Sequence, residues 1–209
     1  MNISKNFCKK KKIDDNHRGI ILAKKEKNLK NIYKEMWILS EKIEKLSLTG
    51  RYDVDMLLSS LHTQLDQLNY FYDYLVSSSP DKDPNKTFYS LKTNPKEHQL
   101  IYVVLGRGYP KELFDAHWCY LLKYCGTKLL VIPTTSIKTT SSSEEKKYYS
   151  DIYEESGNVC RLRFDEMRTI DKMRVITYKP FKDIKTDRSE IEESLKIFLG
   201  IQEKTIDKK

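Results

Sequence analysis

The sequence predicts an α+β chain in which an antiparallel helical hairpin is joined by a linker to a small β-barrel that ends in a helix. Three observations lead to this prediction. Apolar residues recur at spacings of three and four between residues 29 and 75, short β-rich runs follow residue 97, and helical spacing returns near the C-terminus. A chain of 209 residues can bury one substantial core.

The positive charge of the chain lies mainly at its N-terminus. Residues 1–30 contain ten basic and three acidic side chains, so this segment accounts for +7 of the net charge of +8. A basic tail over 1–23 can hold phosphate backbones without sequence specificity, or it can be a solvated tail without a partner. The charge alone therefore does not make the rest of the chain a nucleic-acid-binding protein.

A coiled-coil-like hairpin is predicted over 24–76 from two apolar seams. Gly50 ends the first helix and Asp53 is the expected N-cap of the second. Helices of similar length around a short turn fold back on each other. Aromatic crowding near its end indicates either ordinary core packing or contact with the following domain or a second copy. The seams consist of Leu29, Ile32, Met36, Leu39, Ile43 and Leu46, then Val54, Leu58, Leu61, Leu65, Leu68, Tyr72 and Leu75.

A linker is predicted over 77–96, where three prolines stand among polar residues, and a compact domain over 97–209. Gly126 suits a tight hairpin, and the polar loop 139–158 has room for a short strand. A closing helix starts at a capping box of Ser189 and Glu192 and ends at Gly200. Short strands with a terminal helix favour a strongly curved sheet or barrel. The expected strands cover 100–105, 117–123, 127–133, 159–165 and 173–178.

The cysteines and histidines predict neither a metal site nor a cofactor. Cys8, Cys119, Cys125 and Cys160 form no CxxC pair, and the four histidines form no HExxH motif. No apolar run is long enough to cross a bilayer, and no apolar core follows the N-terminal basic residues as in a secretion signal. We therefore expect a cytoplasmic protein without a membrane partner.

The most distinctive stretch is NVCRLRFDEMRTIDKMRV, residues 158–175, in which a charged strand is followed by the run RTID. The stretch SLKIFLGI lies near the C-terminus, and Thr135-Ser136 ends the third expected strand. In order and spacing, residues 100–202 resemble the MazF/PemK/Kid family of type II toxins. The family's first strand, loop and second strand are matched by Leu105, Gly108, Glu112 and His117. The hairpin has no counterpart in the minimal family members.

The resemblance implies a small, SH3-like barrel of the CcdB/PemK type that forms a homodimer. It implies the toxin of a toxin–antitoxin system, silenced by a cognate antitoxin protein. Such a toxin cuts single-stranded mRNA at specific sequences without a metal, leaving 2′,3′-cyclic phosphate and 5′-hydroxyl ends. A fold does not decide function, so a non-catalytic protein remains the alternative, either a gyrase poison or an RNA-binding module.

The resemblance implies four catalytic residues, His117, Arg163, Asp165 and Thr135. His117 titrates near neutrality, whereas Arg163 stays charged and suits phosphate stabilisation. Asp165 either orients His117 or accepts the proton of the ribose 2′-hydroxyl, and Thr135 donates to the scissile phosphate. Strand alternation places Arg161, Arg163 and Asp165 on one face. The plainer alternatives are a structural histidine and a surface ion pair.

Further residues receive binding or structural roles. The expected RNA contacts are Arg161, Lys111, Trp118 and Ser136, and the expected structural residues are Glu112 in its loop and Arg168, Thr169 and Asp171 in the turn after the charged strand. Trp118 replaces a common proline and Lys111 a small residue, so the base preference is not predicted. Trp118 can stack on a base or narrow the site. Residues 24–76 are expected to serve dimerisation or antitoxin docking.

Overall fold

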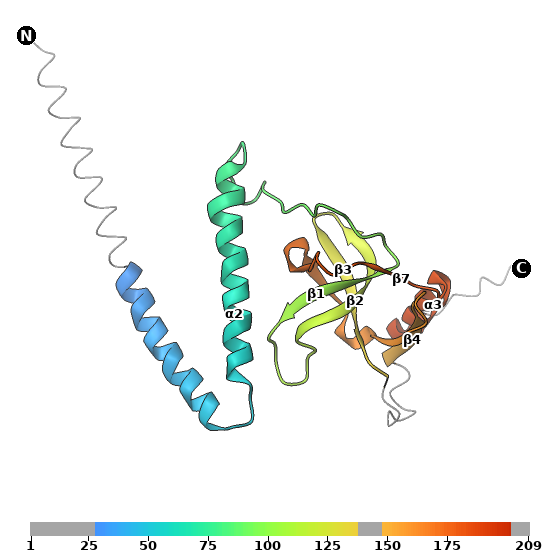
Figure 1. Ribbon diagram of the computed structural model, residues 1–209, viewed down its shortest axis with the longest axis horizontal. Coiled ribbons are helices and arrows are strands. Elements are labelled where there is room, and N and C mark those ends of the chain that lie inside the picture. Colours follow the sequence, from blue (N-terminus) through green and yellow to red (C-terminus); the bar gives the residue numbers. More distant parts are fainter. Residues whose placement is uncertain (1–27, 138–147, 202–209) are drawn as a thin grey trace, which may run out of the picture. The chain divides into compact units, whose positions relative to one another are not determined.

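The computed structural model describes residues 28–137 and 148–201 (Figure 1). The predicted basic tail over 1–23 lies outside the described residues. The chain divides into two compact units, Met1–Leu57 and Leu58–Lys209, and the boundary falls inside helix α2 (Val54–Asn69). The described residues form an α+β structure of helices and one antiparallel sheet.

The N-terminal half is helical, as predicted. Residues 28–48 form a helix that ends before Gly50, whose φ of +61° is the left-handed conformation that favours glycine. The Asp53 carboxylate accepts from the Met56 amide at 2.9 Å and so caps α2. Helix α2 then passes directly into a π-helix, η1 (Tyr70–Val76).

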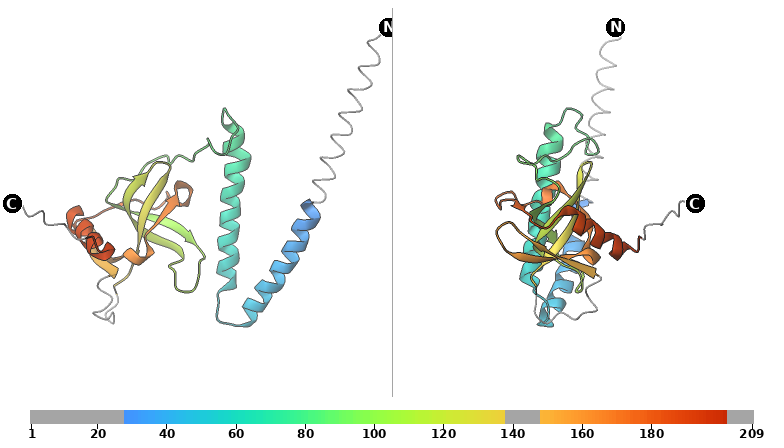
Figure 2. Two further views of the ribbon diagram at one scale, coloured as in Figure 1. Left: turned by 180° about the vertical axis from the view of Figure 1, so that it is seen from behind. Right: turned by 90° about the vertical axis from the view of Figure 1, so that its right-hand side faces the viewer.

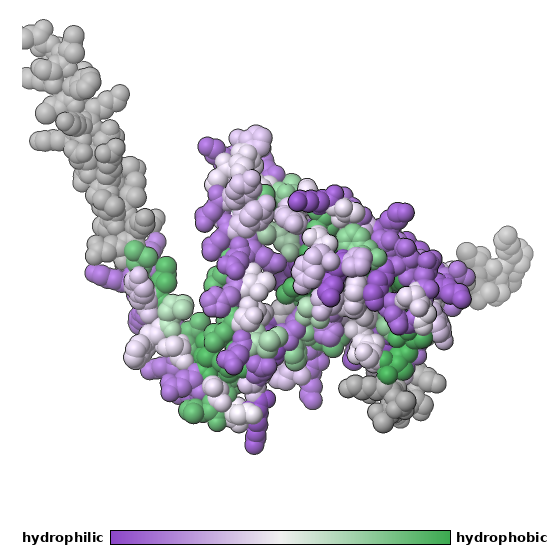
Figure 3. Space-filling model, viewed as in Figure 1, coloured by the Kyte–Doolittle hydropathy of each residue, from purple (hydrophilic) through white to green (hydrophobic). Residues whose placement is uncertain are grey.

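Apolar side chains lie at the surface of the helix 28–48 (Figure 3). Ile32 is 54% and Met36 57% exposed, although both belong to the predicted seam. Helix α2 also has no buried residue. These helices therefore carry more exposed apolar surface than isolated surface residues would give.

Seven strands form the sheet, in the order β4-β5-β3-β2-β1-β7, with β6 paired to β3. Gly126, at φ +63°, makes the predicted hairpin between the second and third strands. The strands are β1 (Gln99–Gly106), β2 (Asp115–Cys125), β3 (Lys128–Thr135), β4 (Tyr149–Tyr153), β5 (Val159–Arg163), β6 (Arg168–Asp171) and β7 (Lys182–Asp183). The short strand expected within 139–158 is therefore present as β4.

The sheet is open, which corrects the predicted closed SH3-like barrel. Among the described residues, the edges at β4 and β7 are joined by a single bridge, between Glu154 and Ile184. Strand β7 has only two residues and follows Pro180, which has no amide hydrogen to donate to a ladder. A continuous closing ladder therefore does not form.

The strand predicted over 173–178 is wrong. The strand lies earlier, at β6, and is followed by a 3₁₀-helix, η4 (Lys172–Arg174). The Asp171 carboxylate accepts from the Met173 amide at 2.8 Å, which starts η4 and ends the strand. The strand predicted over 159–165 likewise stops at Arg163, where a second 3₁₀-helix, η3 (Phe164–Glu166), begins.

Both faces of the sheet are buried, which explains the unbroken apolar runs of the strands. Leu100 and Ile101 are neighbours in β1 but belong to two separate apolar clusters. The first cluster includes Leu91, so the segment 77–96, expected as a linker, packs on the sheet. The second includes Ile191 of helix α3 (Arg188–Leu199), which lies beside β4 (Figure 2).

Helix α3 starts differently from the prediction. Asp187 stands at the N-cap, and the Glu192 carboxylate accepts from the Arg188 Nε at 2.7 Å, so the expected capping box of Ser189 and Glu192 is wrong. Gly200, at φ +69°, ends the helix as predicted. In the described part of the chain, no helix combines the length and apolarity needed to cross a membrane.

We expect stability to fall when the pH drops below about 6.5, because His98 is held in its neutral form. Its Nδ1 lies 3.0 Å from the hydroxyl of the fully buried Tyr120. Burial, and then the charge of Arg188, lower the pKa of His98. A backbone hydrogen bond with Thr186, and then the charges of Asp187 and Glu192, raise this pKa more weakly. The unfolded chain therefore binds the proton first, which favours unfolding in acid.

The pH effect is measured by thermal unfolding between pH 7.5 and 5. The variant that tests the role of His98 is His98→Asn, because asparagine tolerates the φ of +72° at this position. We expect the fall in Tm between pH 7.5 and pH 5 to be about 1–2 °C smaller in this variant. The effect is small because the His98 ring is partly solvated. An unchanged pH dependence would assign the effect to other groups.

Candidate active site

The strand register brings three of the predicted residues, His117, Thr135 and Arg161, to one face of the sheet. Cys119 of β2 pairs with Pro133 of β3, and Thr135 pairs with Arg161 of β5. His117 lies two residues before Cys119, and alternation therefore puts its side chain on the same face. The face runs from β2 through β3 to β5.

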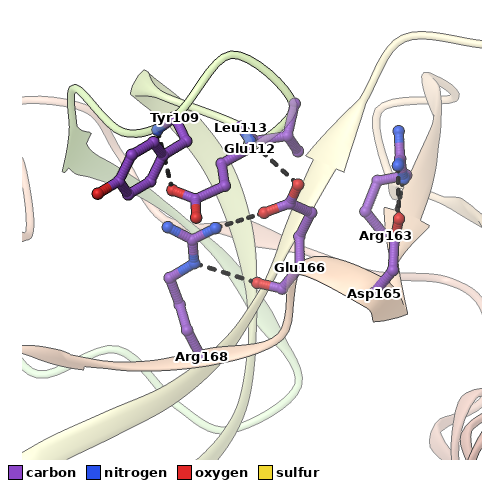
Figure 4. A network of polar contacts seen from close by, with 7 residues as sticks. All are labelled: Tyr109, Glu112, Leu113, Arg163, Asp165, Glu166 and Arg168. Carbon is purple, nitrogen blue, oxygen red and sulfur yellow. Dashed lines mark hydrogen bonds and ion pairs between the residues drawn. The ribbon is translucent and has the colours of Figure 1, made fainter.

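Arg163 and Asp165 form a bidentate ion pair at the end of β5 (Figure 4). The guanidinium Nε and Nη2 donate to the two carboxylate oxygens at 2.9 and 2.6 Å. Asp165 lies in η3 rather than on the strand, so the turn carries it back toward Arg163. The side chains of Arg163 and Asp165 are 34% and 36% exposed, so both are partly accessible to solvent.

His117 is half-buried on β2. Its ring makes no hydrogen bond or ion pair with another described residue, while both oxygens of Asp165 accept from Arg163. The structure therefore does not place Asp165 as the group that orients His117.

The thiol behind His117 is not a nucleophile. Cys119 is fully buried on the same face, and burial raises its pKa to about 12, although Arg168 partly opposes this shift. A thiol with this pKa stays protonated at neutral pH. Cys119 is therefore not a candidate nucleophile.

The end of β3 carries the predicted hydroxyl pair. Thr135 is half-buried and Ser136 exposed. The buried hydroxyl of the preceding Thr134 donates to the Trp118 carbonyl at 2.9 Å and holds the two strand ends together. Thr135 is thereby fixed next to the β2 strand that bears His117.

Trp118 lies on the opposite face of the sheet from His117, because successive residues of a strand alternate. Its ring packs on Tyr102 at 5.2 Å between centroids, and the Lys182 ammonium lies 4.2 Å from the centroid. Trp118 is therefore not placed to stack on a base held at His117. Lys111 is exposed in the loop between β1 and β2.

Arg161, which was expected to contact RNA, is buried against strand β4. It is only 9% exposed, and its Nε and Nη2 donate to the Asp151 carboxylate at 2.6 and 3.0 Å. Its guanidinium also stacks on the Tyr149 ring at 3.8 Å. Both partners come from β4, which the sequence did not place beside Arg161.

Glu112 interacts within its own loop, at the amide of Tyr109. Its Oε2 accepts from that amide at 3.3 Å (Figure 4), and a Cβ at Gly108 would overlap its carboxylate. In the turn after β5, Arg168 donates from Nε to the Glu166 carbonyl at 3.2 Å.

The remaining turn residues differ in what they contact. Asp171 caps η4, as described above, whereas Thr169 is exposed on β6 opposite Leu130. Sequence reasoning missed Glu166, because a single acidic residue beside Asp165 gives no separate signal. Within the described residues, no group of three or more histidine, cysteine or acidic side chains is arranged to hold a metal.

The chain was compared with protein-family models, curated proteins and solved structures. No protein-family model matches the chain, and no curated protein matches it. Among solved structures, the chain is similar to an endoribonuclease in complex with its cognate antitoxin from a mycobacterial species. The two chains are 13% identical, the match covers 52% of this chain and 98% of the other, and the TM-score is 0.39.

Proposed function

We propose that this chain is the toxin of a type II toxin–antitoxin system, a metal-independent endoribonuclease of the MazF/PemK/Kid type that cuts single-stranded mRNA. The observation that carries the proposal is the one-third-exposed, bidentate ion pair between Arg163, which ends the strand that pairs with Thr135, and Asp165 of η3. Such a guanidinium is held in a fixed orientation for phosphate oxygens. The expected substrate, single-stranded mRNA, follows from the resemblance of residues 100–202 to the MazF/PemK/Kid family.

In the proposed reaction the ribose 2′-oxygen attacks the adjacent phosphorus, and the bond to the 5′-oxygen breaks. His117 accepts the 2′-hydroxyl proton, since Asp165 is already committed to Arg163. Arg163 and the Thr135 hydroxyl stabilise the charge on the phosphate oxygens. Water protonates the departing 5′-oxygen, so the products are a 2′,3′-cyclic phosphate and a 5′-hydroxyl.

The proposed partners follow from the same resemblance. A second copy of the chain would complete the RNA-binding surface, and a cognate antitoxin would silence it. The exposed apolar residues of the helix 28–48 support the prediction that residues 24–76 serve dimerisation or antitoxin docking.

The test is cleavage of a long single-stranded RNA in EDTA, followed by sequencing of the fragment ends. We expect cyclic phosphate ends at a recurring sequence, and cleavage about a hundredfold slower for His117→Ala. His62→Ala is the matched control, since His62 is exposed on α2 and away from the site residues in sequence. If His117→Ala cut RNA at the wild-type rate, the proposed catalytic role of His117 would be wrong. RNA binding without cleavage would favour the non-catalytic alternative.

A further inference from the structure

Glu166 is a buried acid next to the proposed site. It is 8% exposed and follows Asp165 directly in η3, but the two carboxylates point in different directions (Figure 4). Asp165 points to Arg163, whereas Glu166 points to the loop between β1 and β2. A buried carboxylate is costly unless it is paired, so the partners of Glu166 matter.

Glu166 has two partners in different parts of the sequence. Its Oε1 accepts from the Leu113 amide at 3.1 Å, across 53 positions of the chain. Its Oε2 forms an ion pair with the Arg168 Nη2, and the Nε of Arg168 also donates to the Glu166 carbonyl. Arg168 thus holds both the backbone and the side chain of Glu166, which leaves the carboxylate fixed toward the loop.

The loop that Glu166 holds is itself a compact unit. The Glu112 amide donates to the Tyr109 carbonyl at 3.0 Å, while the Glu112 carboxylate accepts from the Tyr109 amide. Leu113 follows this turn and comes two residues before Asp115, where β2 begins. His117 is the third residue of that strand. The hydrogen bond at Leu113 therefore joins the start of β2 to the turn that carries Asp165.

We propose that Glu166 is a positioning residue, which holds the loop between β1 and β2, and through it His117, in register with the Arg163–Asp165 pair. The effect on His117 rests on the proposed ribonuclease function, whereas the effect on the loop does not. Glu166 itself does not touch the reacting atoms. Its action is to keep two elements from different parts of the chain at one separation.

The test compares Glu166→Ala with Glu166→Gln in the full chain. Glutamine keeps a carbonyl oxygen for the Leu113 amide, whereas alanine keeps none. In Glu166→Ala we expect the Leu113 amide to exchange with solvent about tenfold faster or more. We also expect kcat for RNA cleavage to fall about tenfold or more with little change in KM, because positioning acts on the chemical step. Glu166→Gln should restore most of both properties.

The matched control is Glu154→Ala. Glu154 is also a buried, ion-paired acid, 5% exposed, but its partners are Lys182, Ser156 and Asn158. It should weaken the fold without changing the relative protection of the Leu113 amide. If the Leu113 amide exchanged at the wild-type rate in Glu166→Ala, the hydrogen bond from Leu113 to Glu166 would not hold the loop. If exchange became faster but kcat stayed unchanged, Glu166 would not position the site. If the wild type cut no RNA, the proposed ribonuclease function alone would be overturned, because hydrogen exchange tests the contact between Glu166 and Leu113 independently of cleavage.

Discussion

Replacing Arg163 by alanine is expected to slow RNA cleavage on the order of a thousandfold, because one fixed donor to a transition-state charge contributes that much in a preorganised site. Arg163 is fixed at both contacts with Asp165, so its orientation is set before RNA binds. Because the Nε and Nη2 edge donates to Asp165, a phosphate would approach the Nη1 side of the guanidinium. The measurement is the rate constant for cleavage of a defined single-stranded RNA under single-turnover conditions.

Two further variants separate charge from geometry at this position. Arg163→Lys keeps the charge but not the planar fork, so we expect it to recover only part of the rate. Arg51→Ala is the control for general loss of basic charge, since Arg51 is exposed in the turn before α2. If Arg163→Ala cleaved as fast as Arg51→Ala, the Arg163–Asp165 pair would be a surface ion pair without a catalytic role.

Glu154→Ala is expected to lower the free energy of unfolding by about 3 kcal/mol, because it removes the buried acceptor of hydrogen bonds from Lys182, Ser156 and Asn158. Both Glu154 oxygens accept from the Lys182 Nζ at 3.0 Å, and the side chains of Ser156 and Asn158 donate to one of them. Glu154 also forms the bridge to Ile184 that joins the two edges of the sheet. Urea unfolding of the full chain measures the change.

The neighbouring acid supplies the control for Glu154. Glu155 is exposed, and its backbone amide, rather than its side chain, donates to the Asp183 carbonyl. Glu155→Ala should therefore stay within about 0.5 kcal/mol of the wild type. Equal losses in the two variants would show that the side-chain contacts of Glu154 do not stabilise the fold.

The contribution of Glu154 should also depend on pH. Burial raises the pKa of Glu154, but the hydrogen bonds from Lys182, Ser156 and Asn158 outweigh burial and lower it. The folded pKa then lies below the unfolded value, so the stabilisation is present above about pH 4.3 and is lost as the pH falls through the folded pKa. The difference between the wild type and Glu154→Ala should therefore shrink in acid.

Local features of the fold were readable from the sequence. Helical spacing predicted the helices, and Asp53, Gly50 and Gly200 marked where they begin or end. Apolar runs predicted β1, β2, β3 and β5, and Gly126 predicted a hairpin. Each of these features depends on residues that are close in sequence, where backbone preference and spacing act directly.

The candidate site was readable only in part. Alternation along β5 puts Arg161 and Arg163 on one face, but it does not show that Asp151 of β4 covers Arg161. Nor does it show that Asp165 turns back to Arg163 through η3. These differences decide that the Arg161 guanidinium is buried and that the Arg163 guanidinium is partly exposed.

The sequence by itself determined where the helices and most strands lie, and which residue types are available for chemistry on phosphate. Only the tertiary structure decided that the sheet stays open, that β6 precedes the expected strand, and that Glu166 reaches Leu113. The physical reason is that these features depend on the register between strands far apart in the chain. Register is set by packing on both faces of the sheet together, which no short stretch of sequence contains.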